Sequence, residues 1–154
     1  METNELYLKA AFCCMACDGS IVEEETNLLK DKVQNSELFS GIDIENTINE
    51  YVNSINLVGS SFLVSFLEEL KQAELNEEEQ LNILGIAIEV IEADNEIKYS
   101  EIKFFKRIRS LLSIEDEAIL AKYPDKEDYL LPDISQDEYE FMPNASFAAF
   151  SILS

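Results

Sequence analysis

Two kinds of reactive group stand side by side near the amino terminus, in the stretch CMACDGSIVEEE. Three thiols, Cys13, Cys14 and Cys17, come directly before Asp18 and a run of glutamates that ends at Glu25. Thiolates bind soft metals and carry redox chemistry, whereas carboxylate oxygens bind hard cations such as calcium and magnesium. The stretch therefore raises two separate possibilities, a thiol site and an acidic cation site.

The thiols fit a buried structural role better than a metal or redox role. A structural zinc site takes four Cys or His ligands, and the chain has three cysteines and no histidine, so a carboxylate or a second molecule would have to complete it. A redox C-x-x-C pair normally begins a helix, whereas Cys14 and Cys17 end one, where the helix dipole disfavours a thiolate. We expect small buried apolar side chains, in a reducing compartment.

The acidic part of the stretch recurs 76 residues later, where ADNEIKYSE repeats the pattern of CDGSIVEEE. The matched pairs are Asp18 and Asp94, Gly19 and Asn95, Ile21 and Ile97, and Glu25 and Glu101. Gly and Asn most readily adopt the left-handed conformation that ends a helix. Each copy therefore predicts an apolar helix, a tight turn and a second helix, with the isoleucine packing the connecting loop against the core.

The repeated carboxylates have two interpretations. Glu25 and Glu101 fall at the third position of their helices, where a glutamate accepts a hydrogen bond from the amide of the capping residue. This bond and the favourable interaction with the helix dipole together stabilise the helix by about 1 kcal/mol. Alternatively, Asp18 and Glu25 converge on a hard cation through their carboxylate oxygens, with loop carbonyls and water completing six to eight ligands. Neither copy has the full pattern of an EF-hand loop. The sequence also leaves open whether the two turns form one site or two.

These residues belong to a chain that we expect to be all-α, because it has only four glycines and three prolines. Segments 6–17 and 76–92 are apolar on nearly every face, which is typical of helices at the centre of a core, and Asn76 with Glu79 forms a capping-box pattern. The other helices are expected at 23–35, after Asp43, at 62–70, at 100–112, and from Ser113, with Asp116 at the capping-box distance, to about Tyr123.

The predicted architecture is a compact bundle of about seven helices over residues 1–123, containing two pseudo-repeated helix–turn–helix units. At this length a single core is large enough to stabilise the fold. Residues 124–154 mix proline, aspartate and aromatic residues without a sustained period. We expect an irregular acidic and aromatic tail whose last stretch, ASFAAFSILS, docks on the domain or on another molecule.

The amino-acid composition argues against three classes of protein: nucleic-acid binders, membrane-inserted proteins and enzymes. Thirty-two acidic and eleven basic residues give a formal net charge of −21, so nucleic acid is not an expected partner. No apolar run approaches the ~20 residues of a membrane helix, and METNELYLKAAF lacks the features of a secretory signal, so we expect a cytoplasmic protein without membrane insertion. Without histidine or a glycine-rich phosphate loop, the usual catalytic arrangements are missing, and we expect no enzymatic activity.

Each copy of the repeat consists of an apolar helix, the sequence C-D-G-S-I or A-D-N-E-I, and a helix with glutamate in its first turn. This doubled motif resembles the tellurite-resistance TerB family. It is also similar to the amino-terminal domain of DjlA-type co-chaperones. The resemblance covers about residues 6–123 and implies a divalent-cation site at Asp18, Glu25, Asp94 and Glu101. The sequence departs from the family at Val22 and Lys98, where Ser, Thr or Asp is frequent, and at Asn95, which replaces a glycine.

Two functional hypotheses follow. The first is a cytoplasmic TerB-like protein with a stress-response or scaffold role, which binds calcium or magnesium through the motif carboxylates and is recruited to a protein partner. The second is an acidic inhibitor or immunity-type protein that blocks a basic protein partner, and it is supported by net charge alone. The sequence specifies neither the partner nor the oligomeric state.

Overall fold

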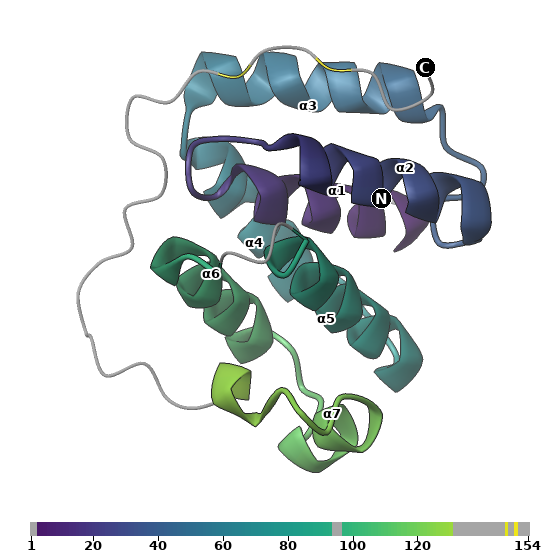
Figure 1. Cartoon of the computed structure of the whole chain (residues 1–154), viewed down its shortest axis with the longest axis vertical. Coiled ribbons are helices and arrows are strands. Elements are labelled where there is room, and N and C mark those ends of the chain that lie inside the picture. The colour runs from purple at the N-terminus through teal and green to yellow at the C-terminus, as the bar shows by residue number, and fades with distance from the viewer. Residues whose placement is uncertain (1–2, 94–96, 131–146, 148–149, 151–154) are drawn as a thin grey trace.

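The computed structural model describes residues 3–93, 97–130, 147 and 150, and all regular elements in that part of the chain are helices (Figure 1). The elements are α1 (Thr3–Ala16), α2 (Glu23–Asn35), α3 (Ile44–Val58), α4 (Ser61–Gln72), α5 (Glu77–Ile91), α6 (Tyr99–Ser110), α7 (Asp116–Lys122) and the short 3-10 helix η1 (Glu127–Leu130). The expected all-α bundle of about seven helices is confirmed. Among the described helices, none is both long and apolar enough to cross a membrane.

The first helix, α1, is the centre of the bundle. Every residue from Leu6 to Ala16 is buried, and the helix contacts α3, α4, α5 and α6. Helix α5 packs along α1 and is itself buried from Ile83 to Ile88. Because both helices are buried over most of their length, neither needs the polar stripe of a surface helix. The prediction that both lie in the core is confirmed.

Local capping signals set several helix starts. The Asn76 side chain accepts a hydrogen bond from the Glu79 amide at 2.8 Å, and the Glu79 carboxylate accepts one from the Asn76 amide at 2.9 Å, which completes the expected capping box of α5. Asp43 caps α3 by accepting from the Asn46 amide at 3.3 Å. These bonds satisfy amides that have no partner within the helix.

The first turn of the pseudo-repeat has the predicted geometry, but the predicted packing of the isoleucine is wrong for the second loop. Gly19 has a φ of 92°, in the left-handed region, and its amide donates to the Ala16 carbonyl at 3.0 Å. Ile21 packs against the core as expected, but Ile97 is 50% exposed. A single exposed isoleucine is readily tolerated at a protein surface, so the two loops are equivalent in pattern but not in burial.

Helix α7 begins at Asp116 and not at Ser113, which corrects the expected start. The cause is the buried side chain of Gln80, whose carbonyl oxygen accepts a hydrogen bond from the Ile114 amide at 2.9 Å and whose amide donates to the Ser113 hydroxyl at 3.2 Å. Gln80 also donates to the Leu75 carbonyl at 3.0 Å. These hydrogen bonds hold residues 113 and 114 against Gln80 of α5, outside any helix.

The chain continues to pack on the bundle beyond the expected boundary at residue 123. The Tyr129 ring of η1 lies 5.3 Å from the Phe105 ring of α6. Its hydroxyl donates to the Glu92 carboxylate at 2.7 Å, and the Lys126 ammonium pairs with the same carboxylate at 2.6 Å. Of the remaining tail, Phe147 and Phe150 contact the bundle, and residues 131–146, 148–149 and 151–154 lie outside the described residues.

Candidate functional site

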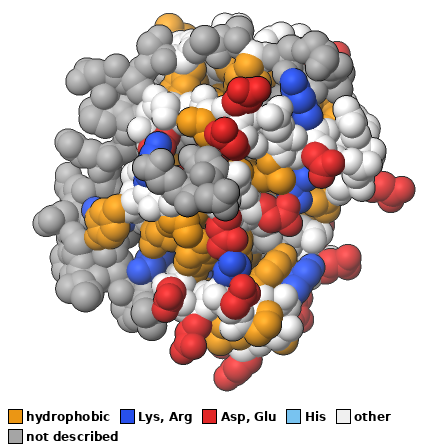
Figure 2. Space-filling model, in the orientation of Figure 1, with side chains coloured by type: hydrophobic (Ala, Val, Ile, Leu, Met, Phe, Trp, Pro, Cys, Tyr) orange, Lys and Arg blue, Asp and Glu red, His pale blue; other side chains and the backbone are white. Residues whose placement is uncertain are grey.

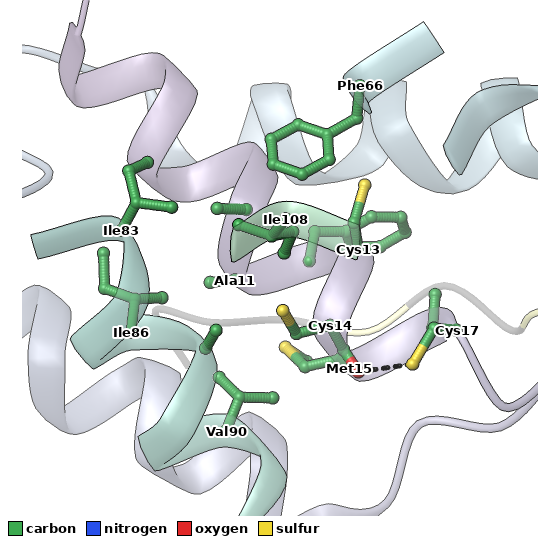
Figure 3. Packing of buried hydrophobic residues seen from close by; sticks show 14 of the residues in the cluster. Ala11, Cys13, Cys14, Met15, Cys17, Phe66, Ile83, Ile86, Val90 and Ile108 are labelled. Carbon is green, nitrogen blue, oxygen red and sulfur yellow. Dashed lines mark hydrogen bonds between the residues drawn. The ribbon is translucent and has the colours of Figure 1, made fainter. Parts of the chain in front are cut away.

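The three thiols at the end of α1 are buried and unpaired. The exposed fraction of Cys13, Cys14 and Cys17 is at most 1%, and Cys17 donates a hydrogen bond to the Cys14 carbonyl at 3.3 Å. Figure 3 shows the three sulfur atoms pointing in different directions from the helix, among side chains such as Phe66 of α4 and Val90 of α5. The thiols therefore fill the core, as the sequence predicted.

Electrostatics keep these thiols protonated. Burial raises the pKa of all three well above the ordinary value, because the thiolate would lose its hydration. At Cys17 the neighbouring Cys14 and then Glu101, Asp18 and Glu25 raise the pKa further. A protonated, buried thiol is neither a nucleophile nor a metal ligand at neutral pH. The negative charges of three predicted ligands therefore act on the same thiol.

Asp18, the first predicted ligand, is held by two partners at the start of the turn. One carboxylate oxygen accepts a hydrogen bond from the Ser20 amide at 3.0 Å, and the other pairs with the Lys98 ammonium at 2.8 Å. Only 9% of the Asp18 side chain is exposed, against 35% of the Lys98 side chain. The carboxylate is therefore nearly buried and is neutralised by a lysine that comes 80 positions later in the chain.

Glu25 and Glu101 take the capping geometry that the sequence predicted. The Glu25 carboxylate accepts a hydrogen bond from the Val22 amide at 3.0 Å, and the Glu101 carboxylate accepts one from the Lys98 amide at 2.9 Å. Both glutamates are only 4% exposed. Only this half of the capping box forms, because the side chains of Val22 and Lys98 lack an acceptor. Each buried carboxylate thereby sits at the positive end of a helix dipole.

The ion pair between Lys98 and Asp18 brings the two pseudo-repeats together. Lys98 directly precedes α6, and Asp18 lies two residues after the end of α1, so the turn after α1 and the start of α6 lie side by side. We call Asp18, Glu25, Lys98 and Glu101 the acidic junction. Three of the four predicted ligands belong to it, and Asp94 lies outside the described residues.

The acidic junction combines three carboxylates with one ammonium. Chemically, it stabilises the positive charge of Lys98 through the ion pair with Asp18. In the part of the chain that the structure describes, no group of three or more Cys, Asp or Glu side chains is arranged to hold a metal ion. Sequence reasoning noted Lys98 only as a departure from a family pattern and missed its role. A lysine at a cap position, beside a repeated acidic motif, was the available signal.

A second buried ion pair was also missed. The Lys9 ammonium of α1 contacts both oxygens of Glu69 in α4, at 2.8 and 3.0 Å, and lies 4.9 Å from the centre of the Phe62 ring. About 10% of the Lys9 side chain is exposed. Its signal in the sequence was a lone lysine within an otherwise apolar helix. The contact ties α1 to α4 and lies in a different part of α1 from the acidic junction.

Comparisons with protein-family models, with curated proteins and with solved structures found no match. The resemblance to the TerB family therefore rests on the two sequence motifs and the order of helices.

Proposed function

We propose that this protein is a non-enzymatic cytoplasmic scaffold of the TerB-like kind, with a role in stress response, and that its acidic junction binds calcium or magnesium in exchange for the Lys98 ammonium. The observation that carries the proposal is the 2.8 Å pair between Lys98 and Asp18, which joins both acidic turns at one place. One site built from both turns can offer more carboxylate ligands than either turn alone.

The charges of the junction favour a cation of higher charge than an ammonium. Asp18, Glu25 and Glu101 carry three formal negative charges in a region that is largely shielded from water, and Lys98 supplies one positive charge. Hard divalent cations prefer carboxylate oxygens. Because the Lys98 side chain is about one-third exposed and has a flexible stem, it can turn to solvent and leave its place to a metal ion without disturbing α6.

A scaffold role is supported by the burial of the thiols and by the lack of histidine. The thiols are buried with raised pKa values, and the chain has no histidine. The inhibitor hypothesis has weaker support, because on the face shown in Figure 2 the acidic side chains are scattered among apolar and basic ones. Charge alone does not single out a surface for a basic partner, so a scaffold recruited to a protein partner is our preferred function.

The cation proposal is tested by thermal unfolding with calcium or magnesium in excess. A ligand that binds only the folded state at one hundred times its Kd adds about 2.7 kcal/mol to the free energy of unfolding. Lys98→Met removes the competing ammonium and should tighten cation binding, whereas Asp18→Asn should abolish it. Glu24→Gln changes the exposed glutamate next to Glu25. It is the matched control and should behave as the wild type.

The same melting-temperature measurements can also rule out cation binding at the junction. If neither metal raises the melting temperature of the wild type or of Lys98→Met, the junction is a purely structural contact in which lysine is the permanent cation. A rise of the same size in Asp18→Asn would place the metal elsewhere on the acidic surface.

A further inference from the structure

A pocket of about 460 Å³ lies where the start of α1 meets the loop that leads into α3. The Asn4 side chain donates a hydrogen bond to the Ser40 carbonyl of this loop at 2.7 Å, so the loop lies beside α1 (Figure 1). The Tyr51 hydroxyl of α3 donates to the Glu5 carbonyl of α1 at 3.4 Å, which holds α3 on the same end of α1. The residues that line the pocket include Asn4, Glu5, Ser40, Asp43 and Thr47, and we call it the α1–α3 pocket.

The side chain of Thr47, near the start of α3, is buried without a hydrogen-bond partner. Only 9% of Thr47 is exposed, and its hydroxyl neither donates to nor accepts from any described residue. Polar side-chain atoms in such buried positions are nearly always hydrogen-bonded, because burial removes their hydration. Thr47 forms part of the wall of the α1–α3 pocket. A polar atom of a ligand in this pocket would therefore complete a hydrogen bond that the fold leaves unmade.

The charges around the α1–α3 pocket are negative. Glu5 and Asp43 contribute two carboxylates, and the described residues of the pocket wall include no lysine or arginine. Neither carboxylate forms an ion pair with a described residue, and one Asp43 oxygen accepts a hydrogen bond from the Asn46 amide at 3.3 Å as the cap of α3. The positive end of a helix dipole amounts to only about half an elementary charge. The pocket therefore favours a cation that donates hydrogen bonds.

The size of the pocket favours an organic cation over a bare metal ion. A cavity of about 10–15 Å³ is enough to hold one water molecule, whereas this pocket of about 460 Å³ falls in the range of about 300–1,000 Å³ that is typical of small-molecule sites. Among the described residues, no three Cys, Asp or Glu side chains are arranged to hold a metal ion. Two carboxylates from different elements match a ligand with two ammonium groups.

We propose that the α1–α3 pocket binds a short aliphatic diamine. One ammonium group pairs with Glu5 and the other with Asp43, and the Thr47 hydroxyl accepts a hydrogen bond from an ammonium N–H. A diamine held in this way links α1 to the start of α3, so its binding stabilises the folded chain. The pocket lies at the start of α1, whereas the acidic junction lies beyond its end. Diamine binding is therefore independent of cation binding at the junction.

The test is isothermal titration calorimetry of the full-length chain with putrescine, a four-carbon diamine. In about 0.15 M salt, where distant acidic groups are largely screened, the wild type should bind one equivalent. Butylamine, which has a single ammonium group, should bind about fivefold more weakly. Glu5→Gln and Thr47→Val should each weaken putrescine binding about fivefold, the first by loss of a charge and the second by loss of a hydrogen bond. Glu50→Gln removes an equal charge from an exposed position of α3 outside the pocket wall, and this matched control should bind putrescine as the wild type does.

A second readout separates ligand binding from a structural role of Thr47. Because its hydroxyl makes no hydrogen bond in the fold, Thr47→Val should keep or raise the melting temperature without ligand, and a clear decrease would overturn its assignment to the ligand. The proposal as a whole fails if putrescine gives no heat of binding. It also fails if Glu50→Gln weakens binding as much as Glu5→Gln, which would indicate a general attraction to the acidic surface. Weaker binding in Asp18→Asn, with Glu5→Gln unchanged, would place the diamine at the acidic junction instead.

Discussion

Raising the pH should unfold this protein through its buried thiols. Burial raises the pKa of Cys13, Cys14 and Cys17 well above the ordinary value, whereas in the unfolded chain a cysteine titrates near its reference pKa of ~8.5. Above that pH the unfolded state releases three protons that the folded state still holds. Since stability falls with pH wherever the unfolded state binds fewer protons, the free energy of unfolding should be constant near neutrality and decline in alkali.

The size of the effect follows from the number of thiols. Each retained proton contributes about 1.4 kcal/mol per pH unit, so three thiols give a slope of about −4 kcal/mol per pH unit above pH ~9.5. At two pH units above the reference pKa, each thiol that is still protonated in the folded state accounts for about 2.7 kcal/mol, or about 8 kcal/mol for three. This approaches the whole stability of an ordinary domain, about 5–15 kcal/mol. The raised pKa values of Tyr51 and Tyr129 add to the decline at still higher pH.

The assay is urea unfolding followed by circular dichroism in the presence of a reducing agent, at several pH values from 7 to 10.5. Cys14→Ala should reduce the alkaline slope by about one-third, whatever it costs in stability at pH 7. Met15→Leu is the matched control, because it changes a buried neighbour of similar volume without removing a titrating group. Its slope should equal that of the wild type.

Equal slopes for the wild type and Cys14→Ala between pH 9 and 10.5 would contradict a raised pKa of the Cys14 thiol. In that case the thiols would be titrating in the folded protein as they do in the unfolded chain, and they could not be buried as described.

Substitutions at three buried polar contacts give further tests, each read through the free energy of unfolding in urea. Lys98→Met should cost about 1–2 kcal/mol without added metal, because Asp18 is then nearly buried without a counter-charge, and adding Asp18→Asn should restore part of the loss; no restoration would mean that the pair does not interact. Lys9→Met should be close to neutral, whereas Glu69→Gln should cost about 2 kcal/mol by leaving the ammonium buried and unpaired; equal effects would contradict the burial of Lys9. Gln80→Met should cost about 2–4 kcal/mol because three hydrogen bonds are lost, and a change below 0.5 kcal/mol would show that they contribute little.

Features that depend on nearby residues could be predicted from the sequence. The apolar faces of segments 6–17 and 76–92 predicted the two central helices, and the capping box at Asn76 and Glu79 predicted the start of α5. The position of Glu25 and Glu101 three residues after a helix start predicted their bonds to the capping amides. These interactions form within one helical turn, so the order of residues specifies them directly.

The start of α7, which was predicted wrongly, depends on a residue that is distant in the sequence. Ser113 has a good capping side chain, but Gln80, 33 positions earlier, binds the backbone and hydroxyl at that point. A distant buried side chain that satisfies the backbone can override a local capping preference, and no local pattern announces it.

For the candidate sites, the sequence by itself determined the identity of the carboxylates, the burial of the thiols and the internal repeat. Only the tertiary structure decided that the turn after α1 meets the start of α6, that Lys98 neutralises Asp18, and that Asn4 bonds to Ser40 beside the α1–α3 pocket. These pairs are separated by 80 and 36 positions. Their contact depends on how helices pack against one another, which is set by the fit of side chains across the whole core and not by any short stretch of sequence.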